Sequence, residues 1–155
     1  MKHPNGRKLF VTCDFPPVLG GQANYFKNLW LERDPENDRL LLPQSCRAFC
    51  ASSGLSNVRF ARLPSGETGF ARLGRVASLF FALLGQCLVF RPAEIHAGQI
   101  LSAGLCCRLL KPVFRFRYVL YLFGADVMEF TRFRPFRRLM LSIMRRSSLL
   151  LACSN

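Results

Sequence analysis

Short apolar runs alternate with longer amphipathic stretches along the chain. The first run, Lys8–Cys13, has β-strand character and leads into a turn-rich loop, Asp14–Gly21. A helical pattern follows from Gln22 to Leu31. Apolar runs bounded by turn residues favour strands, whereas a 3.6-residue apolar period favours a helix. A strand, a glycine turn and a helix are therefore predicted at the start of the chain.

The same alternation continues to the end of the sequence. Further strands are predicted at Arg39–Leu42, Val58–Leu63, Glu94–Ala97, Tyr118–Phe123 and Leu149–Cys153. Helices are predicted from the 64–69 loop to Phe90, over Leu101–Leu110 and over Arg134–Arg146. This order predicts right-handed β-α-β crossovers and a sheet covered on both faces. The expected fold is a three-layer α/β/α Rossmann-like domain with a mostly parallel sheet, in which ligands bind beyond the carboxyl ends of the strands.

Length and composition indicate one folded domain, residues 1–155. The chain is half hydrophobic and has 15 Phe, which argues against disorder. Its 155 residues suffice for one α/β domain but not for two of ordinary size.

The net charge of +13 is concentrated after the first third of the chain, since fifteen Lys/Arg and four Asp/Glu follow Asn57. A basic face of this kind serves nucleic acid, an anionic bilayer or a phosphorylated substrate, or is simply solvated. The predicted helix Arg134–Arg146 interleaves arginines with Phe136, Leu139 and Met140. Such a helix suits an anionic membrane surface, and the competing account is that its apolar side packs on the sheet with the arginines in solvent.

Cysteine content and hydropathy favour a cytoplasmic protein, peripheral at the inner face of the cytoplasmic membrane if the basic helix binds there. The seven Cys are odd in number and several lie in apolar runs, as expected of reduced thiols. No pair has zinc-ligand spacing with a suitable His, so no metal is expected. The N-terminus lacks a signal-peptide pattern. The longest apolar stretch, Val76–Phe90, is roughly fifteen residues against the ~20 of a spanning helix, which favours a core or interfacial helix.

Gly20 and Gly21 come directly before the first predicted helix. Free N–H groups and the helix dipole at such a start favour a phosphate. The alternative is a tight strand-to-helix turn without a ligand. Neither a dinucleotide G-x-G-x-x-G motif nor a P-loop is present.

Three segments resemble one enzyme family. Residues 9–26, LFVTCDFPPVLGGQANYF, resemble the opening of family 4 glycosyltransferases of the GT-B fold. RPAEIHAG (91–98), LSAG (101–104) and YVLYLFGAD (118–126) resemble that family's successive strand ends. The arginines of 137–146, followed by LLLACS (149–154), resemble the helix and strand that close its N-terminal domain. The resemblance covers nearly the whole chain from Lys8.

The resemblance implies a retaining hexosyltransferase that moves a sugar from a nucleotide-sugar to a glycan or lipid-linked acceptor, without a metal or other cofactor. It implies that Gly20 and Gly21 approach the donor diphosphate. The acceptor side of the cleft would be formed by Asp14, Gln22, Asn24, His96, Gly98, Gly124 and Asp126. Asp126 would bond an acceptor hydroxyl or cap the following helix. His96 would contact substrate or be satisfied inside the fold.

The sequence departs from the family pattern in two ways. Phe123 occupies a position where the family often has His, which removes a polar contact to the donor sugar. The family's second, donor-binding domain would follow Asn155, so the chain by itself is expected to be inactive. The alternatives are a basic nucleic-acid-binding module, for which no recognition motif is present and no nucleic acid is expected, and the acceptor half of a split transferase with a separate donor half.

Overall fold

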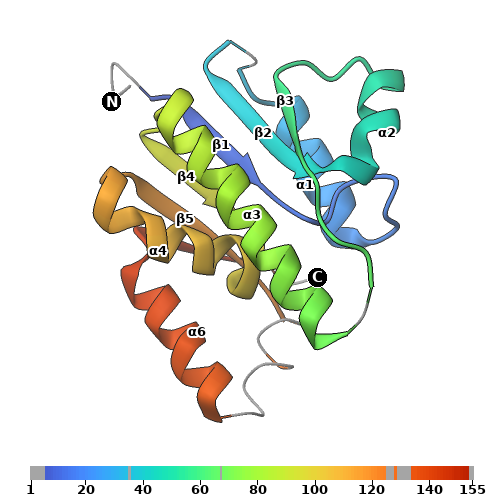
Figure 1. Ribbon diagram of the computed structural model, residues 1–155. Coiled ribbons are helices and arrows are strands. Elements are labelled where there is room, and N and C mark those ends of the chain that lie inside the picture. Colours follow the sequence, from blue (N-terminus) through green and yellow to red (C-terminus); the bar gives the residue numbers. More distant parts are fainter. Residues whose placement is uncertain (1–5, 35, 67, 125–127, 129–133, 154–155) are drawn as a thin grey trace.

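A six-stranded sheet forms the centre of the protein in a computed structural model that describes residues 6–34, 36–66, 68–124, 128 and 134–153 (Figure 1). The strand order is β3-β2-β1-β4-β5-β6, and every neighbouring pair is parallel. The strands are β1 (Lys8–Val11), β2 (Asp38–Pro43), β3 (Val58–Ala61), β4 (Glu94–Ala97), β5 (Arg117–Phe123) and β6 (Leu149–Cys153). The predicted parallel α/β sheet is confirmed.

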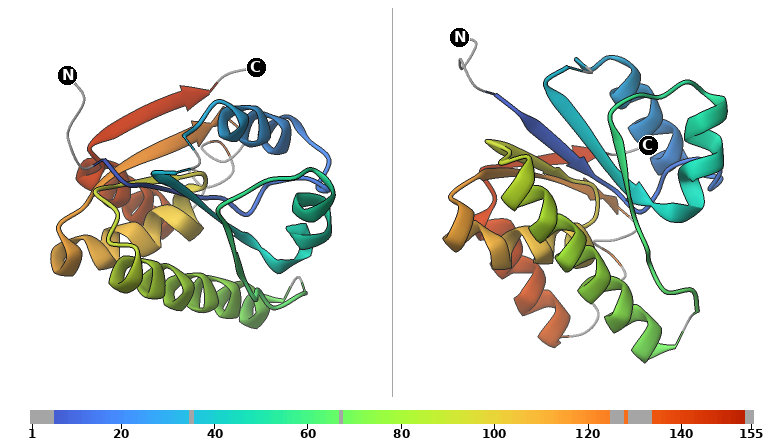
Figure 2. Two further views of the ribbon diagram at one scale, coloured as in Figure 1. Left: turned by 90° about the horizontal axis from the view of Figure 1, so that it is seen from above. Right: turned by 45° about the horizontal axis from the view of Figure 1, so that its top comes forward.

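Helices cover both faces of this sheet (Figure 2). On one face lie α1 (Gly21–Leu31) and α2 (Arg47–Ser52), the latter preceded by the 3-10 turn η1 (Gln44–Cys46). On the other face lie α3 (Gly69–Val89), α4 (Leu105–Phe114) and α6 (Arg134–Arg146), with the π-helical turn η2 (Ile100–Gly104) leading into α4. The sequence pattern missed η1 and α2, whose short 44–52 segment has no extended helical period, and it placed the end of α4 four residues early.

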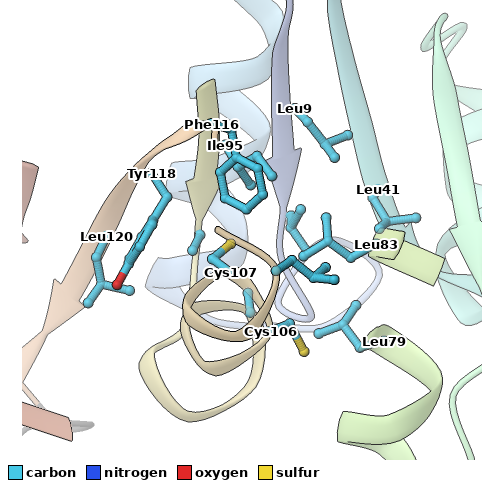
Figure 3. Packing of buried hydrophobic residues seen from close by; sticks show 14 of the residues in the cluster. Leu9, Leu41, Leu79, Leu83, Ile95, Cys106, Cys107, Phe116, Tyr118 and Leu120 are labelled. Atoms are coloured by element: carbon cyan, nitrogen blue, oxygen red, sulfur yellow. The ribbon is translucent and has the colours of Figure 1, made fainter. Parts of the chain in front are cut away.

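The strand residues belong alternately to two hydrophobic clusters, because successive side chains of a strand point to opposite faces of the sheet. Leu9, Leu41, Ile95 and Leu120 face α3 and α4, where Leu79, Leu83, Cys106 and Cys107 meet them (Figure 3). Phe10, Leu40, Tyr121 and Phe123 face α1, where they meet Phe26 and Trp30. The core is therefore split into two layers by the sheet, as a three-layer fold requires.

The strand order reverses between β1 and β4. From β1 the chain builds outward to β2 and β3, and it then returns to the other side of β1 to build β4, β5 and β6. Loops that leave adjacent strands in opposite directions open a crevice at their carboxyl ends. The segments after β1 and β4 are therefore the place where this fold offers a binding site.

Candidate functional site

The loops after β1 and β4 are joined at the switch point. The Gly98 N–H donates to the Val11 carbonyl at 2.8 Å, which extends the β1–β4 pairing beyond the last residues of both strands. A Cβ at Gly98 would lie 2.8 Å from Phe26 Cζ and 2.9 Å from Thr12 Cβ. Only glycine lets the two loops and α1 approach this closely, so the predicted cleft residue Gly98 is buried and acts in packing.

Four residues form a polar network here, which we call the switch-point cluster: Thr12, Cys13, Asp14 and Gln99. The Gln99 Nε2 donates to Thr12 Oγ1 and to Asp14 Oδ2, both at 2.9 Å. Its Oε1 accepts the Cys13 N–H at 3.0 Å. Thr12 Oγ1 also accepts the Asp14 N–H at 3.1 Å, which holds the loop in a tight turn. Gln99 thus ties the loop after β1 to the loop after β4.

Within this cluster Cys13 is not a nucleophile. Burial, with a further contribution from the Asp14 carboxylate, raises the pKa of the Cys13 thiol to about 11. The thiol is therefore protonated at neutral pH, whereas nucleophilic catalysis needs the thiolate. No group of three or more His, Cys, Asp and Glu suited to a metal ion occurs among the described residues.

The predicted phosphate-binding residues Gly20 and Gly21 lie at the start of α1, at the end of the loop that begins with the switch-point cluster. Both are exposed. Gly20 has φ +155° and offers no side chain to cap the helix. The first turn of α1 contains no acidic residue. Within the described part of the chain, the N-cap side of the first turn therefore has no side-chain cap, which leaves the positive end of the helix dipole open to an anion.

Two further predicted cleft residues belong to the same turn of α1. Gln22 is half-buried and Asn24 is exposed, and the Asn24 N–H donates to the Gly20 carbonyl at 3.2 Å. Both lie close to Gly21 in the first turn of α1, and their contact with an acceptor stays a prediction.

His96 lies inside β4, within the layer covered by α1. Its Nδ1 is 2.9 Å from the Tyr121 hydroxyl and its Nε2 is 2.9 Å from Glu94 Oε1. Its ring stacks on Phe10 with 4.2 Å between centroids. Both ring nitrogens are engaged inside the fold, and substrate contact by His96 stays a prediction.

Burial lowers the pKa of His96 to about 4, against the opposing effect of the Glu94 carboxylate. Since the unfolded value is 6.5, the unfolded chain binds more protons than the folded one between these values. We expect the free energy of unfolding to fall by about 2 kcal/mol as the pH drops from roughly 6.5 to 5. Urea titrations at both pH values measure this loss. In the His96→Gln variant the loss should largely disappear, and an equal loss there would contradict the assignment.

Phe123 closes the α1 face of the sheet at the end of β5. It is buried, and its ring meets Tyr25 at 5.9 Å and Phe26 at 5.7 Å, both edge to face. Packing of the ring against α1 accounts for an aromatic residue at this position. Gly124 follows and is exposed, and Asp126 lies outside the described residues.

Sequence reasoning missed Thr12 and Gln99 as site residues. The signal that was present is their place just after β1 and β4, the adjacent strands of the switch point, since Thr12 follows Val11 and Gln99 comes two residues after Ala97. Neither residue type nor spacing singles them out, because their partnership spans 87 positions and depends on the strand order.

Comparisons with known proteins bear on the fold. No protein-family model matches the chain, and no curated protein matches it in sequence. Among solved structures, UDP-GlcNAc 2-epimerase from Methanocaldococcus jannaschii is similar, with a TM-score of 0.59 and 15% sequence identity. The match covers 94% of this chain and 39% of that enzyme, so the chain spans about two fifths of its length. The chain therefore has a Rossmann-like fold that matches part of this GT-B-like structure.

Proposed function

We propose that this chain is the acceptor-side, N-terminal domain of a retaining glycosyltransferase. It would form one wall of a cleft in which a sugar passes from a nucleotide-sugar donor to a glycan or lipid-linked acceptor. A second domain, in the same or a separate chain, would hold the nucleotide. The observation that supports this most is the uncapped Gly20–Gly21 start of α1, which follows the switch-point cluster beyond the carboxyl ends of β1 and β4.

The geometry suits stabilisation of a leaving diphosphate. Charge develops on the diphosphate as its bond to the sugar breaks, and fixed N–H donors at a helix start lower the energy of that charge. Gly20 and Gly21 carry no side chain that would keep a phosphate from the backbone. Neither metal nor cofactor is needed for this contribution, which consists of charge stabilisation and positioning.

The polar groups of the switch-point cluster would orient the acceptor. Asp14 is held by the Gln99 amide, so its carboxylate is fixed relative to the loop after β4. A carboxylate fixed in this way is suited to accept a hydrogen bond from an acceptor hydroxyl. The switch-point cluster would thereby place the acceptor, and α1 would place the diphosphate.

Inorganic pyrophosphate tests the diphosphate contact directly. Titrated into the ¹⁵N-labelled chain, it should shift the amide resonances of Gly20, Gly21 and Gln22 more than those elsewhere. Gly20→Ala should weaken this binding at least about fivefold, because alanine is strained at φ +155° and displaces the turn. The chain should bind without turning over a nucleotide-sugar.

Gly54→Ala is the matched control. Gly54 is also exposed with positive φ, +65°, and an added Cβ meets nothing within 4 Å at either site. Both variants should therefore lose about 1 kcal/mol of stability, but only Gly20→Ala should lose pyrophosphate binding. Shifts spread over the arginine-rich helices, or equal binding by both variants, would count against the proposed site.

A further inference from the structure

Exposed apolar side chains lie along the outward side of α3 from its first turn to its last, and Arg72 in the first turn is also exposed. Its inward side carries the buried residues Leu79 and Leu83, which meet the sheet (Figure 3), and Cys87 belongs to the same cluster. The opposite side carries large exposed side chains. They are Phe70, Leu73, Phe81, Leu88 and Val89, between 58% and 90% exposed, and we call them the α3 outer face.

A soluble helix of this length normally turns charged residues to solvent. On α3 the only charged residues are Arg72 and Arg75, both in its first two turns. By length and composition α3 is apolar enough to cross a membrane. Only 17% of its most apolar 18-residue stretch is buried inside the protein, however. Exposed apolar surface of this extent marks a contact with a partner or a membrane.

The helices on this side of the sheet also carry charge of one sign. In α3, η2, α4 and α6 there is neither Asp nor Glu. Their basic residues are Arg72, Arg75, Arg108, Lys111, Arg134, Arg137, Arg138, Arg145 and Arg146. Figure 2 shows α3, α4 and α6 together in one layer, away from α1 and α2. Apolar and cationic surface therefore occur on the same side of the molecule.

We propose that this side binds an anionic phospholipid surface, with α3 lying in the plane of the interface and its outer face among the acyl chains. The arginines have no acidic residues beside them on these helices, and phospholipid headgroups would supply that negative charge. The expected gain in binding free energy is about 1 kcal/mol for each basic residue near the surface. The buried apolar side chains supply the rest of the binding energy.

Other occupants fit these observations less well. A spanning orientation would take Leu79, Leu83 and Cys87 away from the sheet and uncover the apolar strand side chains that they meet. A second copy would place two cationic layers of like sign against each other. Nucleic acid would leave the apolar side chains of the α3 outer face without a partner in the contact.

Basic residues on α6 contribute to the same layer, but α6 alone does not account for the contact. Met140 and Ile143 of α6 are buried against the domain, which leaves Phe136 and Leu141 about half exposed between arginines. The sequence pattern left membrane contact and packing on the sheet both open for this helix, and it left a core and an interfacial position both open for Val76–Phe90. The structure adds α3, whose outer face holds the larger apolar surface.

Vesicle flotation of the full chain tests the proposal. Vesicles of phosphatidylcholine mixed with phosphatidylglycerol should carry the chain, whereas pure phosphatidylcholine should carry far less, and added salt should release it. Leu88→Glu should reduce the bound fraction at least about tenfold, because it replaces an embedded side chain with an anion.

Leu31→Glu is a closely matched control. Leu31 and Leu88 are the same residue type, lie near the carboxyl ends of α1 and α3, and are 60% and 58% exposed. They lie on opposite sides of the sheet, so Leu31→Glu should bind vesicles like the unaltered chain. If Leu88→Glu does not fold, Phe81→Gln on the same face replaces it.

Four results of the vesicle and RNA experiments would overturn the proposal. They are equal loss in the Leu31 and Leu88 variants, no loss in either, equal binding to uncharged vesicles, and retention of single-stranded RNA in place of vesicles. Dimerisation that Leu88→Glu abolishes, without vesicle binding, would assign the face to a second copy instead. This inference does not rest on the glycosyltransferase proposal, and pyrophosphate binding should be unchanged in the Leu88 variant.

Discussion

Replacing Phe26 with alanine is expected to lower the free energy of unfolding by about 3–5 kcal/mol. The Phe26 ring is 4% exposed and meets Tyr25, Tyr121 and Phe123 edge to face, with centroid distances of 5.5, 5.4 and 5.7 Å. Its removal leaves a cavity between α1 and the sheet that rigid neighbouring rings cannot fill. Urea unfolding followed by circular dichroism measures the loss.

Tyr25→Ala provides the comparison within the same aromatic group. Tyr25 is 38% exposed, so its truncation opens less of a cavity, and we expect a loss of about 1 kcal/mol. Comparable losses for the two residues would show that burial between α1 and the sheet is not what makes Phe26 important. Phe26 also limits the space at Gly98, so Phe26→Ala should loosen the contact between α1 and the loop after β4.

The second large effect is expected for Gln99→Leu, about 3 kcal/mol of destabilisation. Gln99 takes part in three hydrogen bonds that join the loops after β1 and β4. Leucine has a similar size but leaves the Cys13 N–H and the Thr12 and Asp14 oxygens without this partner, at about 1 kcal/mol for each bond. The free energy of unfolding from urea titration is again the measurement.

Gln86→Leu controls for the loss of a glutamine amide as such. Gln86 accepts one bond, from Arg39 Nη1 at 3.0 Å, so its replacement should cost about 1 kcal/mol. Combining Thr12→Val with Gln99→Leu should cost less than the two separate losses together, because both remove the same bond. Strict additivity would mean that Gln99 does not act through Thr12.

Gln99→Leu should also affect the proposed site. The variant frees the Asp14 carboxylate and the start of the loop that leads to Gly20. We therefore expect weaker pyrophosphate shifts at the α1 amides even under conditions in which the variant is fully folded. Unchanged resonance shifts on adding pyrophosphate would show that the diphosphate contact does not depend on the switch-point cluster.

The fold was largely predictable because its elements are local. Glu94–Ala97, Arg134–Arg146 and Leu149–Cys153 have the predicted bounds, since each is set by a short apolar period and nearby turn residues. The glycine turn before α1 was predictable for the same reason. The short α2 was not, because a six-residue helix shows too little of a helical period.

The site was predictable only in outline. Position after a strand indicated where to look, and Asp14, Gly20 and Gly21 do follow β1. His96 also lies near a strand end in sequence, but side-chain alternation turns it under α1 toward Tyr121. The β1–α1–β2 crossover determines which face of the sheet α1 covers. The local sequence around His96 does not encode this.

By itself, the sequence determined the alternation of strands and helices, the glycine start of α1 and the basic character of the chain, all of which arise from neighbouring residues. Only the tertiary structure decided that Gln99 bonds Thr12 and that one side of α3 faces solvent. Bonds between residues far apart depend on strand order. A helix apolar on all sides gives no local sign of which side meets the sheet, so packing alone exposes Phe81 and Leu88.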